Sequence, residues 1–244
     1  MRLLFIRHAN PDYENDSLTE TGKKEAIALG EFLASTKIDE IYVSPLGRAK
    51  QTLDYYLKIS KTEVSPIIKD WLREFDAYCP HDNKHNAWDF LPSTLETYGN
   101  KAFSNDPQEF INAIKAYKDG DFLEKYNKAI SGLDEILKNN GYSRNGLNYD
   151  VIRESEKTIA FFCHFGISSM LLSHLINCSP LTIGQYFCAA PSSVTTIYSE
   201  ERRKGVAQFR ISSFGDTSHL ALKGMKPSFS ARFSETFSDP RRHD

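Results

Sequence analysis

The chain has 244 residues, of which 40% are hydrophobic and 25% are charged, a composition typical of a folded globular protein. Its formal net charge of −2, and the lack of any apolar run long enough for a membrane span, argue against nucleic-acid and membrane partners. The four cysteines have no CxxC spacing, and a chain of this size needs no disulfide staples, so we expect reduced thiols in a cytoplasmic protein.

The first half of the chain alternates between predicted strands and helices. Residues 3–6 are a short apolar run typical of a buried strand of a parallel sheet, and residues 40–43 and 64–68 are further candidate strands. Thr19 is a candidate N-cap of a first helix, and Pro45 can open a second one. Both helices have apolar faces at i, i+3, i+4, i+7 spacing, namely Ala26, Leu29, Gly30 and Leu33, and Ala49, Thr52, Leu53 and Tyr56. The alternation predicts a parallel sheet covered by helices.

The middle of the chain interrupts this pattern. Residues 78–105 are rich in aromatic residues and proline and have no clean period. Two helical stretches follow, and the clearer one carries an apolar stripe from Phe122 to Leu137 before the helix stop Asn140-Gly141. We interpret about residues 78–150 as an insertion, of the kind that often forms a lid over a site.

The alternation resumes after the insertion. Residues 158–163 (TIAFFC) are the most strand-like run of the chain, and residues 166–177 have a helical pattern. Residues 194–198 and 206–213 are predicted to form a final pair of strands around a polar turn. The polar stretch from residue 226 to the end is expected to be a loose tail.

Four segments place reactive side chains directly after a predicted strand or at the start of a predicted helix. Arg7 and His8 follow the first strand, where a guanidinium fork suits phosphate oxygens and a neutral imidazole is a competent nucleophile. Arg48 lies in the first turn of the second helix, whose free N–H groups favour an anion. Glu74 and His164 follow later strands. Each residue alone has an ordinary structural interpretation, but together they predict a phosphate site at the carboxyl edge of the sheet.

These segments resemble, in sequence and in order, those of the histidine phosphatase superfamily, which has a phosphoglycerate-mutase-like fold. The matching pieces are Arg7-His8, residues 18–22 (LTETG), residues 44–52 (SPLGRAKQT), residues 72–74 (LRE) and His164. Together with the element pattern, the resemblance implies a single domain over residues 1–244. Its expected fold is a three-layer α/β/α arrangement with a mostly parallel central sheet and a helical insertion, about residues 78–150, over the carboxyl edge of that sheet.

The resemblance implies a role for each residue in phosphoryl transfer. His8 attacks phosphorus and carries the phosphoryl group transiently. Arg7, Arg48 and His164 surround the phosphoryl oxygens and neutralise their charge, so neither a metal nor another cofactor is implied. Glu74 protonates the leaving alkoxide and then takes a proton from water, which requires a raised pKa. The implied activity is that of a histidine acid-type phosphatase, a metal-independent hydrolase of small phosphomonoesters.

The chain departs from the family pattern directly after the nucleophile. Ala9 stands where the family usually has glycine, so the backbone there must suit an alanine. The position six residues beyond His8, usually asparagine, is Glu14. Asn10 and Asn15 are therefore the candidate residues for this substrate-binding contact.

The residues after Glu74 bear on the choice between phosphatase and mutase. Cofactor-dependent mutases follow their acidic residue with Arg-His-Tyr-Gly, whereas residues 75–78 here read FDAY, which favours a phosphatase. Asp76 is an alternative proton donor. The alternative functions are a phosphoglycerate-type phosphomutase and a non-catalytic regulatory protein that binds a phosphorylated ligand.

The aromatic start of the insertion carries one rival motif. Cys79, His81 and His85 would suit a metal ion if they lay on a helix, but Pro80 opposes a helix there and no second half of such a site follows. We therefore expect no metal, and we assign Tyr78 and His81 to the site entrance, in contact with the leaving group. The expected partner is a small phosphorylated substrate, and the sequence leaves the oligomeric state open.

Overall fold

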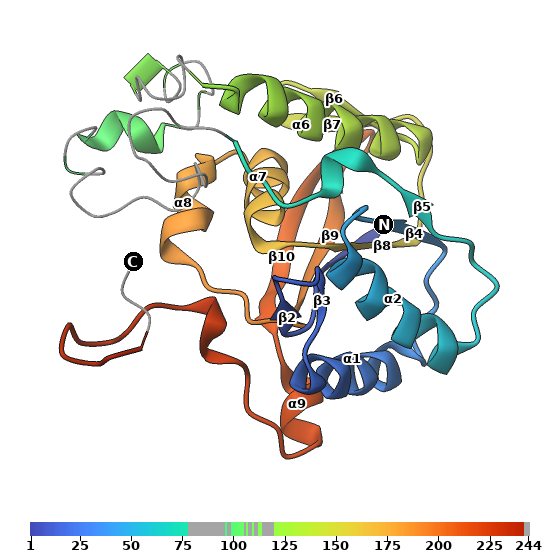
Figure 1. Ribbon diagram of the computed structural model, residues 1–244. Helices are drawn as coiled ribbons and strands as arrows, with labels where there is room; N and C mark the ends of the chain where they lie inside the picture. Colours follow the sequence, from blue (N-terminus) through green and yellow to red (C-terminus); the bar gives the residue numbers. More distant parts are fainter. Residues whose placement is uncertain are drawn as a thin grey trace.

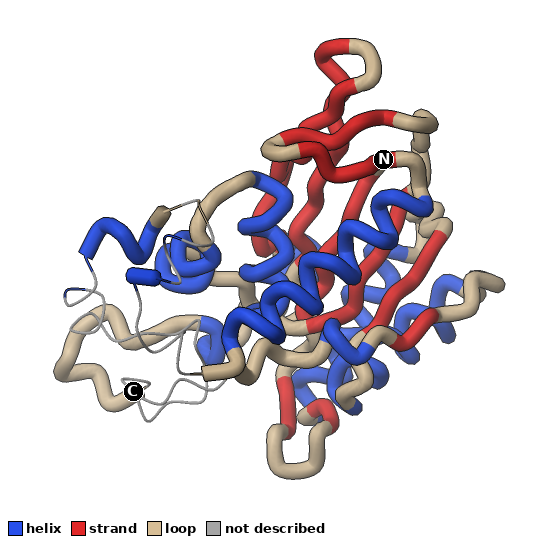
Figure 2. Tube along the Cα trace, turned by 90° about the horizontal axis from the view of Figure 1, so that it is seen from above, coloured by secondary structure: helices blue, strands red, loops and turns tan. Residues whose placement is uncertain are grey.

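The computed structural model describes residues 1–77, 96, 99–104, 106, 109, 112–113 and 120–241. An eight-stranded sheet lies at the centre of the described residues (Figure 1), and its strands are red in Figure 2. In spatial order the strands are β5 (Ile67–Ile68), β4 (Glu40–Val43), β8 (Thr158–Cys163), β1 (Arg2–Arg7), β9 (Val194–Arg203), β10 (Val206–Asp216), β7 (Asn148–Val151) and β6 (Tyr142–Asn145). Of these described strands only β9 and β7 run against the others, so the predicted mostly parallel sheet of an α/β fold is confirmed.

The two halves of the sheet differ in how neighbouring strands pair. β1 and β4 both pair in parallel with β8, and β5 pairs in parallel with β4. From β9 outward every pairing is antiparallel. Parallel neighbours need long crossovers, which are helical here, whereas antiparallel neighbours can be joined by tight turns. The alternating β and α pattern of the sequence therefore belongs to the half of the sheet that carries β1, β4 and β8.

Helices cover both faces of the sheet (Figure 1). On one face lie α1 (Glu20–Leu33), α2 (Gly47–Ser60) and α9 (Ser218–Leu222), and on the other α6 (Phe122–Asn139), α7 (Phe165–Ile176) and α8 (Pro180–Tyr186). Other short elements of the described part are the hairpin of β2 (Pro11–Asp12) and β3 (Ser17–Leu18) and the 3-10 turns η1 (Asp70–Leu72), η2 (Gly99–Phe103) and η3 (Phe229–Ala231). The arrangement is the expected three-layer one.

β1 shows why the central strands are apolar throughout. Leu3 and Phe5 point into the core under α6 and α7, and Leu4 and Ile6 point into the core under α1 and α2. A strand that is covered on both faces must be apolar at every position, which explains the continuous runs in β1 and β8.

The helix starts agree with the sequence signals. The Thr19 hydroxyl caps α1 by accepting a hydrogen bond from the N–H of Gly22 at 3.0 Å. A Cβ on Gly22 would lie 2.1 Å from the carbonyl oxygen of Asn10, so a glycine is needed where the helix passes this loop. α2 begins at Gly47, two residues after Pro45.

Part of the predicted insertion belongs to the core, so the expected boundary needs correcting. α6 packs on α7 and β6 through buried residues such as Phe122 and Leu133. Residues 142–151, expected in the insertion, form the hairpin β6–β7 at the edge of the central sheet. These strands are short and largely polar, so their sequence has no hydrophobic alternation that would distinguish them from a loop. Most of residues 78–119 lie outside the described part of the chain.

The C-terminal stretch is also more ordered than the expected loose tail. The hydroxyl of Ser228 accepts a hydrogen bond from the side-chain amide of Asn10 at 2.7 Å. Further along, the guanidinium of Arg241 lies 4.1 Å from the centre of the Phe229 ring. A hydrogen bond to the loop after β1 therefore anchors this polar segment at Ser228, and the contact of Arg241 with Phe229 folds the segment back on itself.

Candidate active site

The sheet brings the predicted phosphate-binding residues to one edge. β1 ends at Arg7, directly before His8, and β8 ends at Cys163, directly before His164. The two strands pair in parallel with Arg7 opposite Cys163, so the imidazole rings of His8 and His164 are neighbours with centroids 5.0 Å apart. The start of α2, which carries Arg48, follows β4 on the other side of β8.

His8 is buried and held in one tautomer. Its Nδ1 lies 2.8 Å from the carbonyl oxygen of Ala9. A carbonyl oxygen only accepts hydrogen bonds, so Nδ1 carries the proton and Nε2 keeps a free electron pair. Burial, reinforced by the charges of Arg7 and Arg48, holds the pKa of His8 well below its usual value. The imidazole is therefore neutral, and Nε2 is available as a nucleophile at neutral and mildly acidic pH.

His164 presents the opposite nitrogen to the site. Its Nε2 lies 2.7 Å from the hydroxyl oxygen of Ser44, which also accepts a hydrogen bond from the N–H of Leu46 at 3.2 Å. The hydroxyl can donate its hydrogen to Nε2, and in that arrangement the proton of the neutral ring lies on Nδ1. Burial and the neighbouring His8 lower the pKa of His164 well below its usual value. The neutral ring has one N–H to offer.

Each arginine is fixed at one end of its guanidinium. Nη1 of Arg7 donates to the carbonyl oxygen of Ala189 at 2.6 Å. Nη1 of Arg48 donates to the carboxylate of Asp16 at 2.7 Å, and the other carboxylate oxygen accepts from the N–H of Gly47 at 2.6 Å. These bonds orient both guanidinium groups before any ligand arrives.

Three buried nitrogen donors of this cluster lack a partner among the described residues. They are Nε of Arg7, Nε of Arg48 and Nδ1 of His164. Buried donors are almost always hydrogen-bonded, so unpaired ones beside two arginine charges indicate a place for an anion. The free electron pair of His8 Nε2 lies in the same cluster, so an anion bound there would meet both this nitrogen and the donors.

Glu74 lies beside this cluster at the start of α7. Its Oε1 accepts hydrogen bonds from the N–H groups of Phe75, at 2.8 Å, and Ile167, at 3.1 Å. Burial raises the pKa of Glu74, against the opposing effects of these N–H groups and of the charges of Arg7 and Arg48. A carboxyl group with a raised pKa can give a proton and take it back, as general acid–base catalysis requires.

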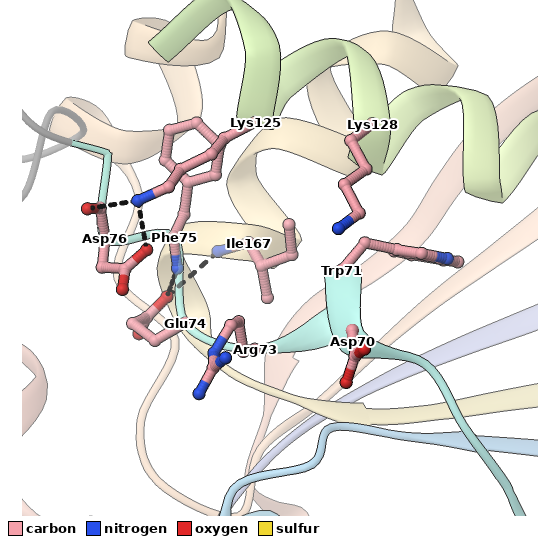
Figure 3. A pocket seen from close by; sticks show the side chains of 9 residues that line it. All are labelled: Asp70, Trp71, Arg73, Glu74, Phe75, Asp76, Lys125, Lys128 and Ile167. Carbon is pink, nitrogen blue, oxygen red and sulfur yellow. Dashed lines mark hydrogen bonds and ion pairs between the residues drawn. The ribbon is translucent and has the colours of Figure 1, made fainter. Parts of the chain in front are cut away.

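Asp76, the alternative proton donor, is placed differently. Its side chain is exposed and forms an ion pair with Lys125 of α6 at 2.8 Å (Figure 3). Asp76 and Lys125, together with Glu74, Trp71 and Lys128, line a cavity of about 300 Å³ (Figure 3). The geometry favours Glu74 over Asp76 as the acid and provides space next to it.

In the SPLGRAKQT segment Thr52 lies one helical turn after Arg48, and this position lets it contact the loop after β1. The hydroxyl of Thr52 accepts a hydrogen bond from the N–H of Ala9 at 3.0 Å and donates to the carbonyl oxygen of Arg48 at 2.8 Å. The loop after β1 is thereby tied to α2. Ala9 is fully buried there, which shows that this backbone accepts an alanine.

Two further predicted residues, Asn10 and Asn15, are not brought into the cluster. The side-chain amide of Asn10 is bonded to Ser228 and Thr19, and that of Asn15 lies in an exposed turn, bonded to Asp12. Their expected contacts with phosphate have no support in this geometry. Tyr78 and His81, like the rival motif of Cys79 and His85, lie outside the described residues.

The sequence analysis missed Ser192, which bonds to the carbonyl group of His8, and His219, which contacts Ser192. Ser192 has a left-handed backbone with φ of 61°, and its N–H donates to the carbonyl oxygen of His8 at 3.0 Å. Its hydroxyl lies 3.0 Å from Nε2 of the buried His219. Burial lowers the pKa of His219 to about 4. A Pro-Ser pair before a strand is the only local signal, and it is too common to mark a site.

Two kinds of feature are absent from the described part of the chain. No group of three or more His, Cys, Asp or Glu side chains there is arranged to hold a metal ion. None of the described helices is both long and apolar enough to cross a membrane.

Known proteins resemble this chain in sequence and in fold. A probable phosphatase of Schizosaccharomyces pombe is 24% identical over 237 residues, which cover 90% of this chain and 95% of that protein. A phosphoglycerate mutase of Candida albicans is 29% identical over 113 residues, 42% of this chain and 44% of that protein. The solved structure of a mycobacterial glucosyl-3-phosphoglycerate phosphatase superposes with a TM-score of 0.59 at 16% identity, covering 88% of this chain and 99% of that one, and supports the fold.

The family model described as histidine phosphatase superfamily (branch 1) matches residues 3–139, more than half of the chain. The match includes His8, Arg48 and Glu74, and the remaining cluster residue, His164, lies beside them in the fold. The chain therefore belongs to the histidine phosphatase superfamily and is a phosphatase-like enzyme.

Proposed function

We propose that this chain is a metal-independent phosphomonoester hydrolase that acts through a phosphohistidine at His8. One observation carries the proposal: a buried, neutral histidine with a free Nε2 lies among three unpartnered buried donors of the described residues. A phosphoryl group supplies acceptors for these donors and an electrophile for the nitrogen. The positive charges of Arg7 and Arg48 stabilise the charge that gathers on the phosphoryl oxygens during transfer.

In the first step the electron pair of His8 Nε2 forms a bond to phosphorus, and the bond from phosphorus to the ester oxygen breaks. Glu74, protonated because of its raised pKa, gives its proton to the departing oxygen. The alcohol leaves and the phosphoryl group stays on His8.

In the second step a water molecule attacks phosphorus and the bond to Nε2 breaks. Glu74, now ionised, takes a proton from the water, so the enzyme returns to its starting state and inorganic phosphate is released. The hydrogen bond from Nδ1 to Ala9 keeps Nε2 turned toward the site throughout. No metal or other cofactor takes part in either step.

The substrate that suits this site is a small phosphorylated compound. The leaving group must lie beside Glu74 to receive its proton, and the cavity there has room for it. Trp71, which also lines this cavity, offers the leaving group an aromatic surface. A phosphoglycerate mutase among the relatives makes phosphoryl transfer back to a sugar acid the second candidate activity. A mutase needs a cation that binds the carboxylate of its sugar-acid substrate. Lys125 of this cavity is already paired with Asp76, which favours hydrolysis.

A cytoplasmic location fits the proposal. Cys163, Cys178 and Cys188, the cysteines within the described residues, are free thiols. Thiols persist in a reducing compartment.

Hydrolysis of an aryl phosphate between pH 5 and 7.5, with a chelator present, tests the function. We expect activity in the wild type, loss in His8→Ala, and retention in His174→Gln, a control whose histidine pairs with Asp134 outside the site. Optimal rates at the acidic end would support the acid-type assignment. Equal activity in wild type and His8→Ala would refute His8 as the nucleophile, and isomerisation of phosphoglycerate would establish the mutase instead.

A further inference from the structure

A second buried acid, Glu25 of α1, lies against the loop that carries the nucleophile. Its side chain is fully buried, and Oε2 accepts a hydrogen bond from the backbone N–H of Asn10 at 2.8 Å. Oε1 is buried as well and has no partner among the described residues. Burial raises the pKa of Glu25 to about 7, against the opposing effects of the Asn10 N–H and of the charge of Arg7. The two catalytic steps above do not use this carboxyl group.

One peptide group joins Glu25 to the nucleophile. The N–H of Asn10 and the C=O of Ala9 belong to the same planar amide. The N–H donates to Glu25, and the C=O accepts from Nδ1 of His8, each bond 2.8 Å long. Hydrogen bonds in such a chain polarise one another, so negative charge at Glu25 increases the negative charge on the Ala9 oxygen.

We propose that Glu25 is a positioning residue that acts through the peptide between Ala9 and Asn10 to strengthen His8 as a nucleophile. When Glu25 is ionised, the more negative Ala9 oxygen holds the Nδ1 proton more firmly and fixes the tautomer. It also stabilises the positive charge that the imidazole gains when Nε2 bonds to phosphorus. The proposal rests on the function proposed above, because it takes His8 as the nucleophile.

A purely structural role for Glu25 would be to satisfy the N–H of Asn10. Glu25→Gln separates the two roles, because the amide oxygen still accepts from that N–H while the negative charge is removed. Glu31→Gln is the matched control. Glu31 lies on the same helix, where its exposed side chain pairs with Lys223 at 2.6 Å.

The first readout is the Nδ1 proton of His8 in protein labelled with ¹⁵N-histidine, at pH 8, where Glu25 is ionised. Its resonance is assigned by its loss in His8→Ala. We expect Glu25→Gln to move this resonance upfield, because the hydrogen bond to Ala9 weakens, and Glu31→Gln to leave it in place. A structural role alone would leave it unchanged in both variants.

The second readout is kcat at the same pH with an aryl phosphate whose leaving group needs no protonation. We expect Glu25→Gln to lower kcat about tenfold, by analogy with the loss found when outer partners of metal-ligating histidines are removed. A folded Glu25→Gln protein with the wild-type resonance and wild-type kcat would overturn the proposal.

Two further outcomes are decisive. If Glu25→Gln does not fold, Glu25→Asp keeps the charge but withdraws it by one methylene group, and an unshifted Nδ1 resonance in that variant would overturn the proposal. If His8→Ala keeps its activity while Glu25→Gln shifts the resonance, the link from Glu25 to His8 stands and the proposed function falls.

Discussion

At the scale of single residues, burial shifts the pKa values of two groups in opposite directions. The pKa of His8 is lowered, so the imidazole stays unprotonated as the pH falls. The pKa of Glu74 is raised, so the carboxyl group stays protonated as the pH rises. The proposed nucleophile in its unprotonated form and the proposed acid in its protonated form therefore coexist on the acidic side of neutrality.

Glu74→Gln tests the acid. We expect kcat for an alkyl phosphate to fall about 100-fold or more, because the leaving oxygen loses its proton donor, and a smaller loss for an aryl phosphate. Wild-type kcat should decline as the pH rises through the raised pKa of Glu74, and this decline should vanish in the variant. Asp76→Asn, which changes an exposed carboxylate paired with Lys125, should keep the wild-type profile. The reverse pattern would make Asp76 the proton donor.

At the scale of elements, short segments far apart in the chain meet around the loop after β1. α2 reaches it through Thr52, and the turn before β9 reaches it through Ser192. α9 supports that turn through His219, whose ring also lies near Phe32 of α1, with ring centroids 5.8 Å apart. A five-residue helix is too short to persist alone, so these contacts hold α9 in place.

The lowered pKa of the buried His219 ring predicts that the stability of the fold depends on pH. The folded protein keeps His219 neutral down to about pH 4, whereas in the unfolded chain this histidine binds a proton below its ordinary pKa of 6.5. The unfolded state therefore gains protons first as the pH falls, and this residue reduces the free energy of unfolding by about 1.4 kcal/mol per pH unit in that window. Urea unfolding of wild type and His219→Gln between pH 7 and 4.5 measures the difference. Parallel curves for the two proteins would contradict the prediction.

At the scale of the whole molecule, a polar network joins the far edge of the sheet to the helices. The hydroxyl of Tyr149 in β7 donates to Asp134 of α6 at 3.2 Å and accepts from Arg144 of β6 at 3.0 Å. Asp134 also contacts His174 of α7 at 2.9 Å. These hydrogen bonds hold the β6–β7 hairpin against α6 and α7, and they include none of the residues of the candidate site.

Tyr149→Phe removes the hydroxyl that bridges Asp134 and Arg144. We expect the free energy of unfolding to fall by about 1 kcal/mol, because two partly buried groups lose a hydrogen-bond partner, while kcat stays unchanged. Chemical denaturation and the phosphatase assay measure both quantities. Tyr198→Phe, at a half-exposed position on β9, is the control and should leave stability unchanged. A drop in kcat for Tyr149→Phe would show that this network reaches the site.

The sequence by itself determined the parts of this protein that local chemistry encodes. The apolar runs of β1 and β8 predicted buried strands, and Thr19 predicted the start of α1, because both signals lie within a few neighbouring residues. The segments that carry Arg7-His8, Arg48, Glu74 and His164 resemble those of the histidine phosphatase superfamily, and the family model confirms that resemblance. In each case the predictive residues are adjacent in the chain or have fixed places relative to strand ends.

Only the tertiary structure decided which polar groups support the site and where the polar segments belong. Glu25, Ser192 and His219 look like ordinary helix and turn residues in the sequence. Glu25 and Ser192 bond to backbone atoms of the loop that carries His8, and His219 contacts the hydroxyl of Ser192, and no sequence motif records these contacts. The hairpin β6–β7 and the C-terminal stretch through residue 241 have no strong apolar pattern, so contacts with distant residues fix their positions. Hydrogen bonds between residues distant in the chain form only once packing has brought the partners together, which is why the sequence does not reveal them.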